Sequence, residues 1–144
     1  MNYKLPLLLL ITSLLWGQPI TGEAQKLEFK KDRIVYTGKV KLTRGEATLR
    51  ARKVTILLDE EGKPLKLVAE GNVLYLEPGR KATADYAEYD LRKEVIVLRG
   101  SAKVEERKNV LEAEEIVYDR RNETLQAKGG EGKVRTIYIE EAQE

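Results

Sequence analysis

The feature that most restricts the fold of this sequence is a seven-residue phrase that it contains twice. Residues 84–90 read Ala-Asp-Tyr-Ala-Glu-Tyr-Asp, and residues 113–119 read Ala-Glu-Glu-Ile-Val-Tyr-Asp. Each phrase begins thirteen residues after a glycine, Gly71 in one copy and Gly100 in the other, so the repeat is about 29 residues long. A period of roughly 20 to 50 residues is typical of one supersecondary unit stacked on copies of itself. We therefore expect a row of similar units that bury their apolar faces against one another.

The repeat is predicted to form mainly β-strands. Within residues 34–42, 65–75 and 96–104, apolar and polar residues alternate, which is the period of two expected of a half-buried strand. Weaker copies of the repeat begin at Gly38 and Gly129. Short strands with a turn about every ten residues predict an all-β sandwich or jelly roll of antiparallel strands. The turn-forming segments are residues 59–64, 77–80, 90–93, 107–109 and 120–123.

The repeated phrase changes the side on which its apolar residues fall. Ala82 and Ala84 lie on one side of a strand, but the next apolar pair, Ala87 and Tyr89, begins three residues later instead of two. A strand that keeps both pairs inward needs a β-bulge or a sharp bend between them. The same slip separates Leu111 and Ala113 from Ile116 and Tyr118, and Leu49 and Ala51 from Val54 and Ile56.

The glycines that precede the phrases lie on the inward side of their own strands. A missing side chain there permits a bend or the close approach of a ligand. A short helix over residues 84–90 is the alternative interpretation of the phrase, because a spacing of three residues is also helical. The second copy contains Ile116, Val117 and Tyr118, which favour a strand.

The N-terminus predicts export. Residues 1–4 carry one positive charge, and residues 5–16 form an apolar run of twelve residues, which is the layout of a secretory signal peptide. Cleavage is expected after Gly17 or after Ala24, so residues 1–24 are assigned to the signal and residues 25–144 to one β domain. The run is shorter than the ~20 apolar residues of a membrane-spanning helix. A retained membrane anchor is the alternative.

Composition argues against several classes of function. The chain has 26 Lys and Arg against 24 Asp and Glu, and this net charge of +2 is too small for a protein that binds nucleic acid through excess positive charge. Histidine and cysteine are absent, so the usual nucleophile–base pairs of catalysis are missing and no disulfide can stabilise the fold. We expect no enzymatic activity, no cofactor and no metal.

Two local patterns have both a functional and a structural interpretation. The carboxylate pairs Asp85 with Glu88 and Glu114 with Glu115 could act as acid and base or hold calcium. They lie opposite the apolar row of their strands, which favours a solvated outer face. The glycine-rich residues 129–132 lack the lysine and following Ser or Thr of a phosphate-binding loop, so a bend in the final strand is expected.

Together these patterns resemble the OstA-like family of lipopolysaccharide transport proteins. The resemblance rests on residues 71–73, on the phrase at residues 84–90 and on its recurrence at residues 116–119, and it covers essentially all of residues 27–139. The first copy departs from the pattern at Arg52 and Lys53, where the others carry an acid. The resemblance implies a V-shaped β-jelly roll that is open at both ends.

The resemblance also implies an LptA-type function and its partners. Lipopolysaccharide would travel in the periplasm from the inner to the outer membrane, with the lipid A acyl chains in the apolar interior of the jelly roll. The implied partners are an inner-membrane LptC-like subunit, an outer-membrane LptD-like translocon and further copies of the chain, joined head to tail by strand addition.

An inward row of apolar residues is the lipid-binding surface that the resemblance implies. Transfer of acyl chains from water is worth ~0.8 kcal/mol per buried methylene, so such a row suits them. From the residues alone, an ordinary core that fills itself is the simpler interpretation. The predicted row consists of Val40, Leu42, Ile56, Leu67, Val73, Tyr75, Ala84, Leu98, Val104, Ala113 and Ile116.

Basic residues near the turns have two interpretations as well. They could meet phosphates on a glycolipid head group, although a solvated face is the commoner explanation. Two alternatives to lipopolysaccharide carriage stay open: an LptC-like subunit anchored by an uncleaved N-terminal segment, and a periplasmic scaffold that uses open sheet edges without lipid. The basic residues are Arg44, Arg50, Arg52, Arg80 and Lys81.

Overall fold

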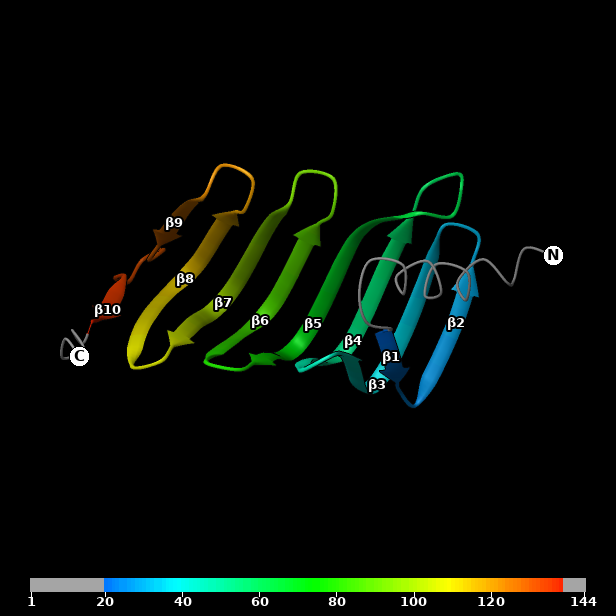
Figure 1. The fold of residues 1–144 in the computed structure, drawn as a ribbon, viewed down its shortest axis with the longest axis horizontal. Helices are drawn as coiled ribbons and strands as arrows, with labels where there is room; N and C mark the ends of the chain where they lie inside the picture. The colour runs from blue at the N-terminus through cyan, green and yellow to red at the C-terminus, as the bar shows by residue number, and fades with distance from the viewer. Residues whose placement is uncertain (1–19, 139–144) are drawn as a thin grey trace.

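The chain folds into a single ten-stranded antiparallel sheet, seen in a computed structural model that describes residues 20–138 (Figure 1). Six long strands lie side by side in sequence order, and each pairs with the next. The predicted all-β jelly-roll class is confirmed, and the helical alternative for residues 84–90 is wrong because they lie in a strand. The long strands are β3 (Arg33–Arg44), β4 (Ala47–Leu58), β5 (Pro64–Glu77), β6 (Arg80–Asp90), β7 (Val95–Glu106) and β8 (Asn109–Asp119).

Each edge of the sheet is a strand broken into two short pieces. β1 (Ile20–Glu23) and β2 (Lys26–Lys30) pair with the two halves of β3. At the other edge, β9 (Thr124–Lys128) and β10 (Arg135–Ile137) pair with the two halves of β8. The sheet therefore begins within the segment that cleavage after Ala24 would remove. Residues 1–19 of the predicted signal peptide lie outside the described residues.

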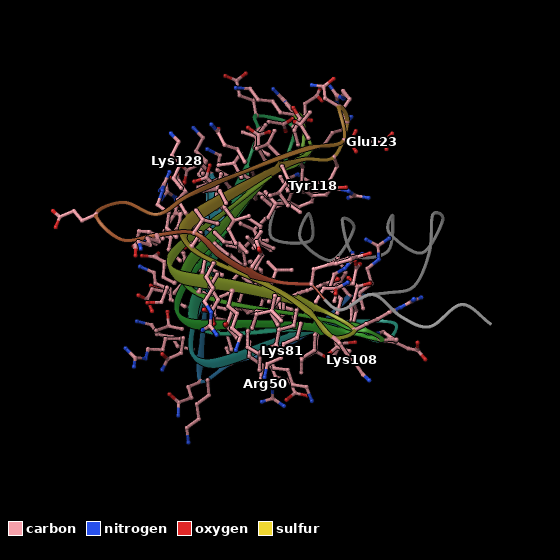
Figure 2. The ribbon with its side chains drawn as sticks, turned by 90° about the vertical axis from the view of Figure 1, so that its left-hand side faces the viewer. Arg50, Lys81, Lys108, Tyr118, Glu123 and Lys128 are labelled. Atoms are coloured by element: carbon pink, nitrogen blue, oxygen red, sulfur yellow. The ribbon has the colours of Figure 1, made fainter. Side chains whose placement is uncertain are left out.

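A sharp bend, which we call the crease, crosses every long strand (Figure 2). Thr37 and Val40 of β3 pair with Lys53 and Ala51 of β4, so β3 contains one extra residue at this point. The bend predicted from the repeated phrase is confirmed, but the extra residue lies in the glycine strand instead of the phrase strand. The crease pairs, with both φ angles positive, are Gly38 and Lys39 (87° and 49°), Gly71 and Asn72 (84° and 48°), and Gly100 and Ser101 (83° and 49°).

Side chains of the neighbouring strand fill the space beside the crease glycines. A Cβ atom added to Gly71 would lie 2.8 Å from Cδ of Arg52, and one added to Gly100 would lie 2.5 Å from Oδ2 of Asp85. Positive φ and lack of space therefore both require glycine. The close approach that the sequence suggested for a ligand is made by the next strand. Arg52 departs from the acidic pattern, yet its side chain occupies the same place as Asp85.

The crease divides the sheet into two arms whose apolar faces meet. In Figure 2 the lower arm carries Arg50, Lys81 and Lys108, and the upper arm carries Tyr118 and Lys128. A core cluster joins residues of both arms at β3–β5, and a second does so at β6–β8. We call this shared apolar side the inner face and the opposite side the outer face. Burial of the inner face is the main stabilising contribution that the structure shows.

Candidate functional site

The inner face near the crease is closed to solvent. Its side chains come from both arms and are at most 7% exposed. Val40 of the lower arm and Val54 of the upper arm belong to one cluster and are 1% and 0% exposed. A close-packed layer of this kind leaves no apolar surface for a ligand. We call the layer the floor; it consists of Val40, Ala51, Val54, Ala69, Val73, Ala84, Ala102, Ala113 and Ile116.

The inner face is only partly covered farther from the crease, where the two arms form walls. The strand register places Leu67, Tyr89, Ile96 and Tyr118 in one row of the upper arm, and Tyr118 is 37% exposed. The floor and the walls together form an apolar trough that runs from β3 to β8. The walls are covered at β3, where Ile34 and Leu42 are 5% and 7% exposed. The upper wall is Ile34, Ile56, Leu67, Tyr89, Ile96, Leu98 and Tyr118, and the lower wall is Leu42, Leu49, Tyr75, Ala82, Val104 and Leu111.

All residues of the predicted row lie on the inner face, but they divide between floor and walls. The floor holds Val40, Val73, Ala84, Ala113 and Ile116; the walls hold Leu42, Ile56, Leu67, Tyr75, Leu98 and Val104. The sequence prediction missed further wall residues, although the same alternation and the same repeated phrase identify them. These residues are Ile34, Leu49, Ala82, Tyr89, Ile96, Leu111 and Tyr118.

Paired charges line the lower rim of the trough. Arg80 forms ion pairs with Glu106 and, at 3.7 Å, with Glu77. The hydrogen bond from Arg80 lowers the pKa of the Glu106 carboxyl, and the same bond raises the pKa of Arg80. Arg80 is exposed but has carboxylate partners. Four other predicted basic residues are also exposed. These are Arg44, Arg50, Arg52 and Lys81.

The loops of the upper rim are joined to one another by arginines. Arg92 of the β6–β7 loop lies 3.2 Å from Asp59 of the β4–β5 loop. Arg121 of the β8–β9 loop donates to the backbone carbonyl of Arg92 at 2.6 Å and lies 3.4 Å from Glu94. These contacts hold neighbouring repeats in line at the mouth of the trough.

The outer face carries an ion-pair network. The Tyr86 hydroxyl donates to Glu88 at 2.6 Å, and Lys66 lies 3.0 Å from the same carboxylate. Arg99 bonds Glu115 at 2.8 Å and stands 5.3 Å from the centre of the Tyr86 ring. Burial, and then Glu88, raises the pKa of Tyr86 to about 12. The carboxylates singled out in the sequence thus lie on the outer face, and within residues 20–138 no three acidic residues gather to hold a metal.

The glycine-rich segment forms the predicted bend. Gly132 donates its N–H to the carbonyl of Gly129 at 2.8 Å, between β9 and β10. Beside it lies an open hollow of about 840 Å³. Lys103 and Arg135 both pair with Glu112 there, at 3.9 and 3.4 Å. Because charges of both signs line this hollow, it suits acyl chains less well than the trough does.

No helix in the described part of the chain is long and apolar enough to cross a membrane. Comparison with known families matches residues 19–124 to the model of the LptA/(LptD N-terminal domain) LPS transport protein.

Two relatives and one solved structure agree with this match. The lipopolysaccharide export system protein LptA of Haemophilus influenzae is 28% identical over 134 residues, covering 85% of this chain and 78% of the relative. LptH of Pseudomonas aeruginosa, also a lipopolysaccharide export system protein, is 31% identical over 119 residues, covering 76% and 68%. The crystal structure of LptH, described as a periplasmic component of the lipopolysaccharide transport device, superimposes with a TM-score of 0.73 at 25% identity, covering 85% of this chain and 96% of that one.

Proposed function

We propose that this chain, which belongs to the LptA/(LptD N-terminal domain) family of LPS transport proteins, carries lipopolysaccharide through the periplasm without catalysing a reaction. The observation that carries the proposal is an apolar trough with a dry floor and partly uncovered walls. The floor supplies stability, so the walls are free to contact acyl chains. Each acyl methylene that leaves water for the walls contributes ~0.8 kcal/mol.

The walls and the outer face can be compared directly by photo-crosslinking. Side chains that crosslink on illumination are placed at Ile96 and Leu111 on the walls, and at Arg99 and Lys103 on the outer face of the same hairpin. We expect lipopolysaccharide to be captured from the wall positions only. Equal capture from both faces would contradict the assignment of the trough, and no capture by a folded protein would favour a scaffold that uses its sheet edges.

Export and cleavage after Gly17 are part of the proposal. β1 pairs with residues 41–44 of β3, so cleavage after Gly17 keeps this strand and cleavage after Ala24 removes it. The match to the family model begins at residue 19, which agrees with the earlier site. Mass spectrometry of the periplasmic protein should show Gln18 as the first residue. A mature chain that starts at Gln25, or an uncleaved chain in the membrane fraction, would contradict this assignment.

Assembly of copies head to tail follows from the uncompleted ends of the sheet. In the upper wall, Ile34 pairs with Ile56, Leu67 with Tyr89 and Ile96 with Tyr118. Leu125 of β9 is the next member of this series, and Phe29 of β2 is its counterpart at the other edge. Their side chains are 53% and 52% exposed. Continuing the register places Leu125 of one copy opposite Phe29 of the next and covers both.

Cysteine crosslinking can test this register because the natural chain contains no cysteine. Two single variants, Leu125→Cys and Phe29→Cys, are mixed and oxidised. Directly opposed residues of antiparallel strands lie about 4.5 to 5.5 Å apart between Cα atoms, within reach of a disulfide. We expect a covalent dimer from this pair and much less from Leu125→Cys with Leu27→Cys, which is two residues out of register. Equal yields would contradict the register.

A further inference from the structure

Arg120 interrupts the apolar side of the upper rim. The backbone N–H groups of Leu58, Leu91 and Arg120 each donate to a carbonyl 26 residues earlier in the chain, at 2.8, 3.0 and 2.9 Å. The three residues therefore occupy the same position in successive repeats. Leucine in two copies fits an apolar rim, whereas arginine in the third copy requires a separate explanation. The acceptors are Asp32, Leu65 and Glu94.

The Arg120 side chain turns back over the trough. Its Nη1 donates to the Tyr89 hydroxyl at 3.1 Å. Tyr89 belongs to the upper wall in β6, so the Arg120 side chain spans β7 to reach it. Among the residues that the structure describes, no carboxylate lies within ion-pair distance of Arg120, in contrast to Arg92 and Arg121 on the same rim. The guanidinium charge at the mouth is thus not neutralised by the fold.

The charge of Arg120 also acts on a second tyrosine, Tyr75 of the lower wall. Burial, followed by a hydrogen bond with Glu77, raises the pKa of Tyr75, while the charges of Arg80 and Arg120 act in the opposite direction. Arg120 is therefore close enough to influence a hydroxyl of the opposite arm. Of the two phenol hydroxyls, that of Tyr89 bonds Arg120 directly, and that of Tyr75 lies within range of the charges of Arg80 and Arg120.

We propose that Arg120, with the hydroxyls of Tyr89 and Tyr75, binds the anionic phosphate group of an amphiphile whose acyl chains lie in the trough. The inference rests on the proposed function, and it assigns the place of the head group. A guanidinium offers several N–H donors in a planar fork that matches phosphate oxygens, and phenol hydroxyls add further donors. The apolar walls beside the site reduce competition from water and strengthen such bonds.

The test compares two probes that share one chain length. Tetradecyl phosphate and tetradecanol are titrated below their aggregation concentrations into the full protein, and affinity is measured by calorimetry. We expect the protein to bind the phosphate about tenfold more tightly than the alcohol, as one charge-assisted contact at a partly desolvated site provides. Inorganic phosphate alone should not bind at millimolar concentration, because it lacks the chain.

Three variants test whether Arg120 causes the tighter binding of tetradecyl phosphate. Arg120→Leu introduces the residue found at Leu58 and Leu91, so the fold should be kept, and the preference for the phosphate probe should disappear while tetradecanol affinity is unchanged. Arg120→Lys keeps the charge and should retain part of the preference. Arg50→Leu on the exposed outer face is the matched control and should behave like the natural protein.

Each outcome decides between the site and the trough. A preference that survives in Arg120→Leu, or equal affinity of the natural protein for both probes, would overturn the head-group site and leave the trough intact. Tight binding of inorganic phosphate alone would assign Arg120 to free phosphate instead of a lipid. Failure of both amphiphiles to bind would overturn the trough and the head-group site with it.

Discussion

The floor and the walls of the trough come from the same strands and the same alternation of residues, yet their exposure differs. Ile116 on the floor is 2% exposed, whereas Tyr118, two residues later on the same side of β8, is 37% exposed. Near the crease the arms are close enough to cover each other, and farther away they diverge. Inward orientation therefore has two consequences in one molecule: stability where the arms meet and uncovered apolar surface where they part.

The largest expected effect comes from a charge on the floor. Val73→Asp places a carboxylate at a site that is 3% exposed, and the neighbouring core side chains are apolar. The free energy of unfolding should fall by about 4 kcal/mol, because the carboxylate loses water and gains no partner. Leu76→Asp on the outer face of the same strand is the control; Leu76 is 37% exposed and should tolerate the change. Chemical denaturation of both variants measures the difference, and similar losses would contradict the division into two faces.

Truncating one isoleucine in each region separates stability from lipid binding. Ile116→Ala on the floor should cost about 3 kcal/mol of unfolding free energy, because the buried site leaves a cavity. Ile96→Ala on the wall should cost only about 1 kcal/mol. The order should reverse for lipopolysaccharide affinity, with the larger loss at Ile96. Chemical denaturation measures the free energy of unfolding of both variants, and lipid-binding titrations measure their affinity for lipopolysaccharide. If Ile116→Ala weakened binding more than Ile96→Ala, the walls would not be the contact surface.

The crease should matter more than an ordinary turn. Gly100→Ala requires an alanine at φ 83° and places its Cβ against Asp85, so we expect a loss of about 2 kcal/mol. Gly79→Ala in the β5–β6 turn has a similar φ of 78° but nothing within 4 Å of the added Cβ. Its cost should be about 1 kcal/mol from backbone strain alone. Thermal unfolding compares the stability of the two variants. Equal losses would show that the contact between the added Cβ and Asp85 does not affect stability.

The smallest expected effect is a difference between the pKa values of a tyrosine on the wall and a tyrosine on the outer face. The pKa of Tyr86 is raised above its unfolded value, to about 12, so its contribution to stability is complete below pH 10 and is lost as the pH rises toward 12. Lipid in the trough should raise the pKa of wall residue Tyr75 further, because it removes water. Tyr86 on the outer face should not respond. NMR titration of ¹³C-labelled tyrosine with and without lipid measures both values; a shift at Tyr86 instead would place the lipid outside the trough.

Much of this arrangement could be predicted from the sequence, because inward orientation depends only on alternation. The slip from Ala84 to Ala87 also predicted the crease. The sequence could not locate the extra residue, since Lys39, Asn72 and Ser101 share no side-chain chemistry and only their positive φ angles unite them. The division into floor and walls depends on the angle between the arms, which no local pattern encodes.

Arg120 was missed for a different reason. Arg120 stands out only when it is compared with Leu58 and Leu91, which occupy the equivalent positions of the other repeats. Positions 58 and 91 are separated by 33 residues, whereas positions 91 and 120 are separated by 29. The extra residues of the first copy hide this equivalence in a simple alignment of the repeats. The backbone hydrogen bonds of the upper rim make it visible.

The crease also has a consequence for how the correct pairing is selected during folding. β3, β5 and β7 are similar strands, and a slip of two residues between neighbours would leave every side chain on its proper face. Hydrophobicity alone therefore cannot reject that error. A slip would, however, separate Gly71 from Arg52 and Gly100 from Asp85, bringing a residue with a Cβ into a space that only glycine can share. The crease therefore disfavours misaligned pairing at each pair of neighbouring strands. Without it, the similarity of the repeats would allow such mispairing.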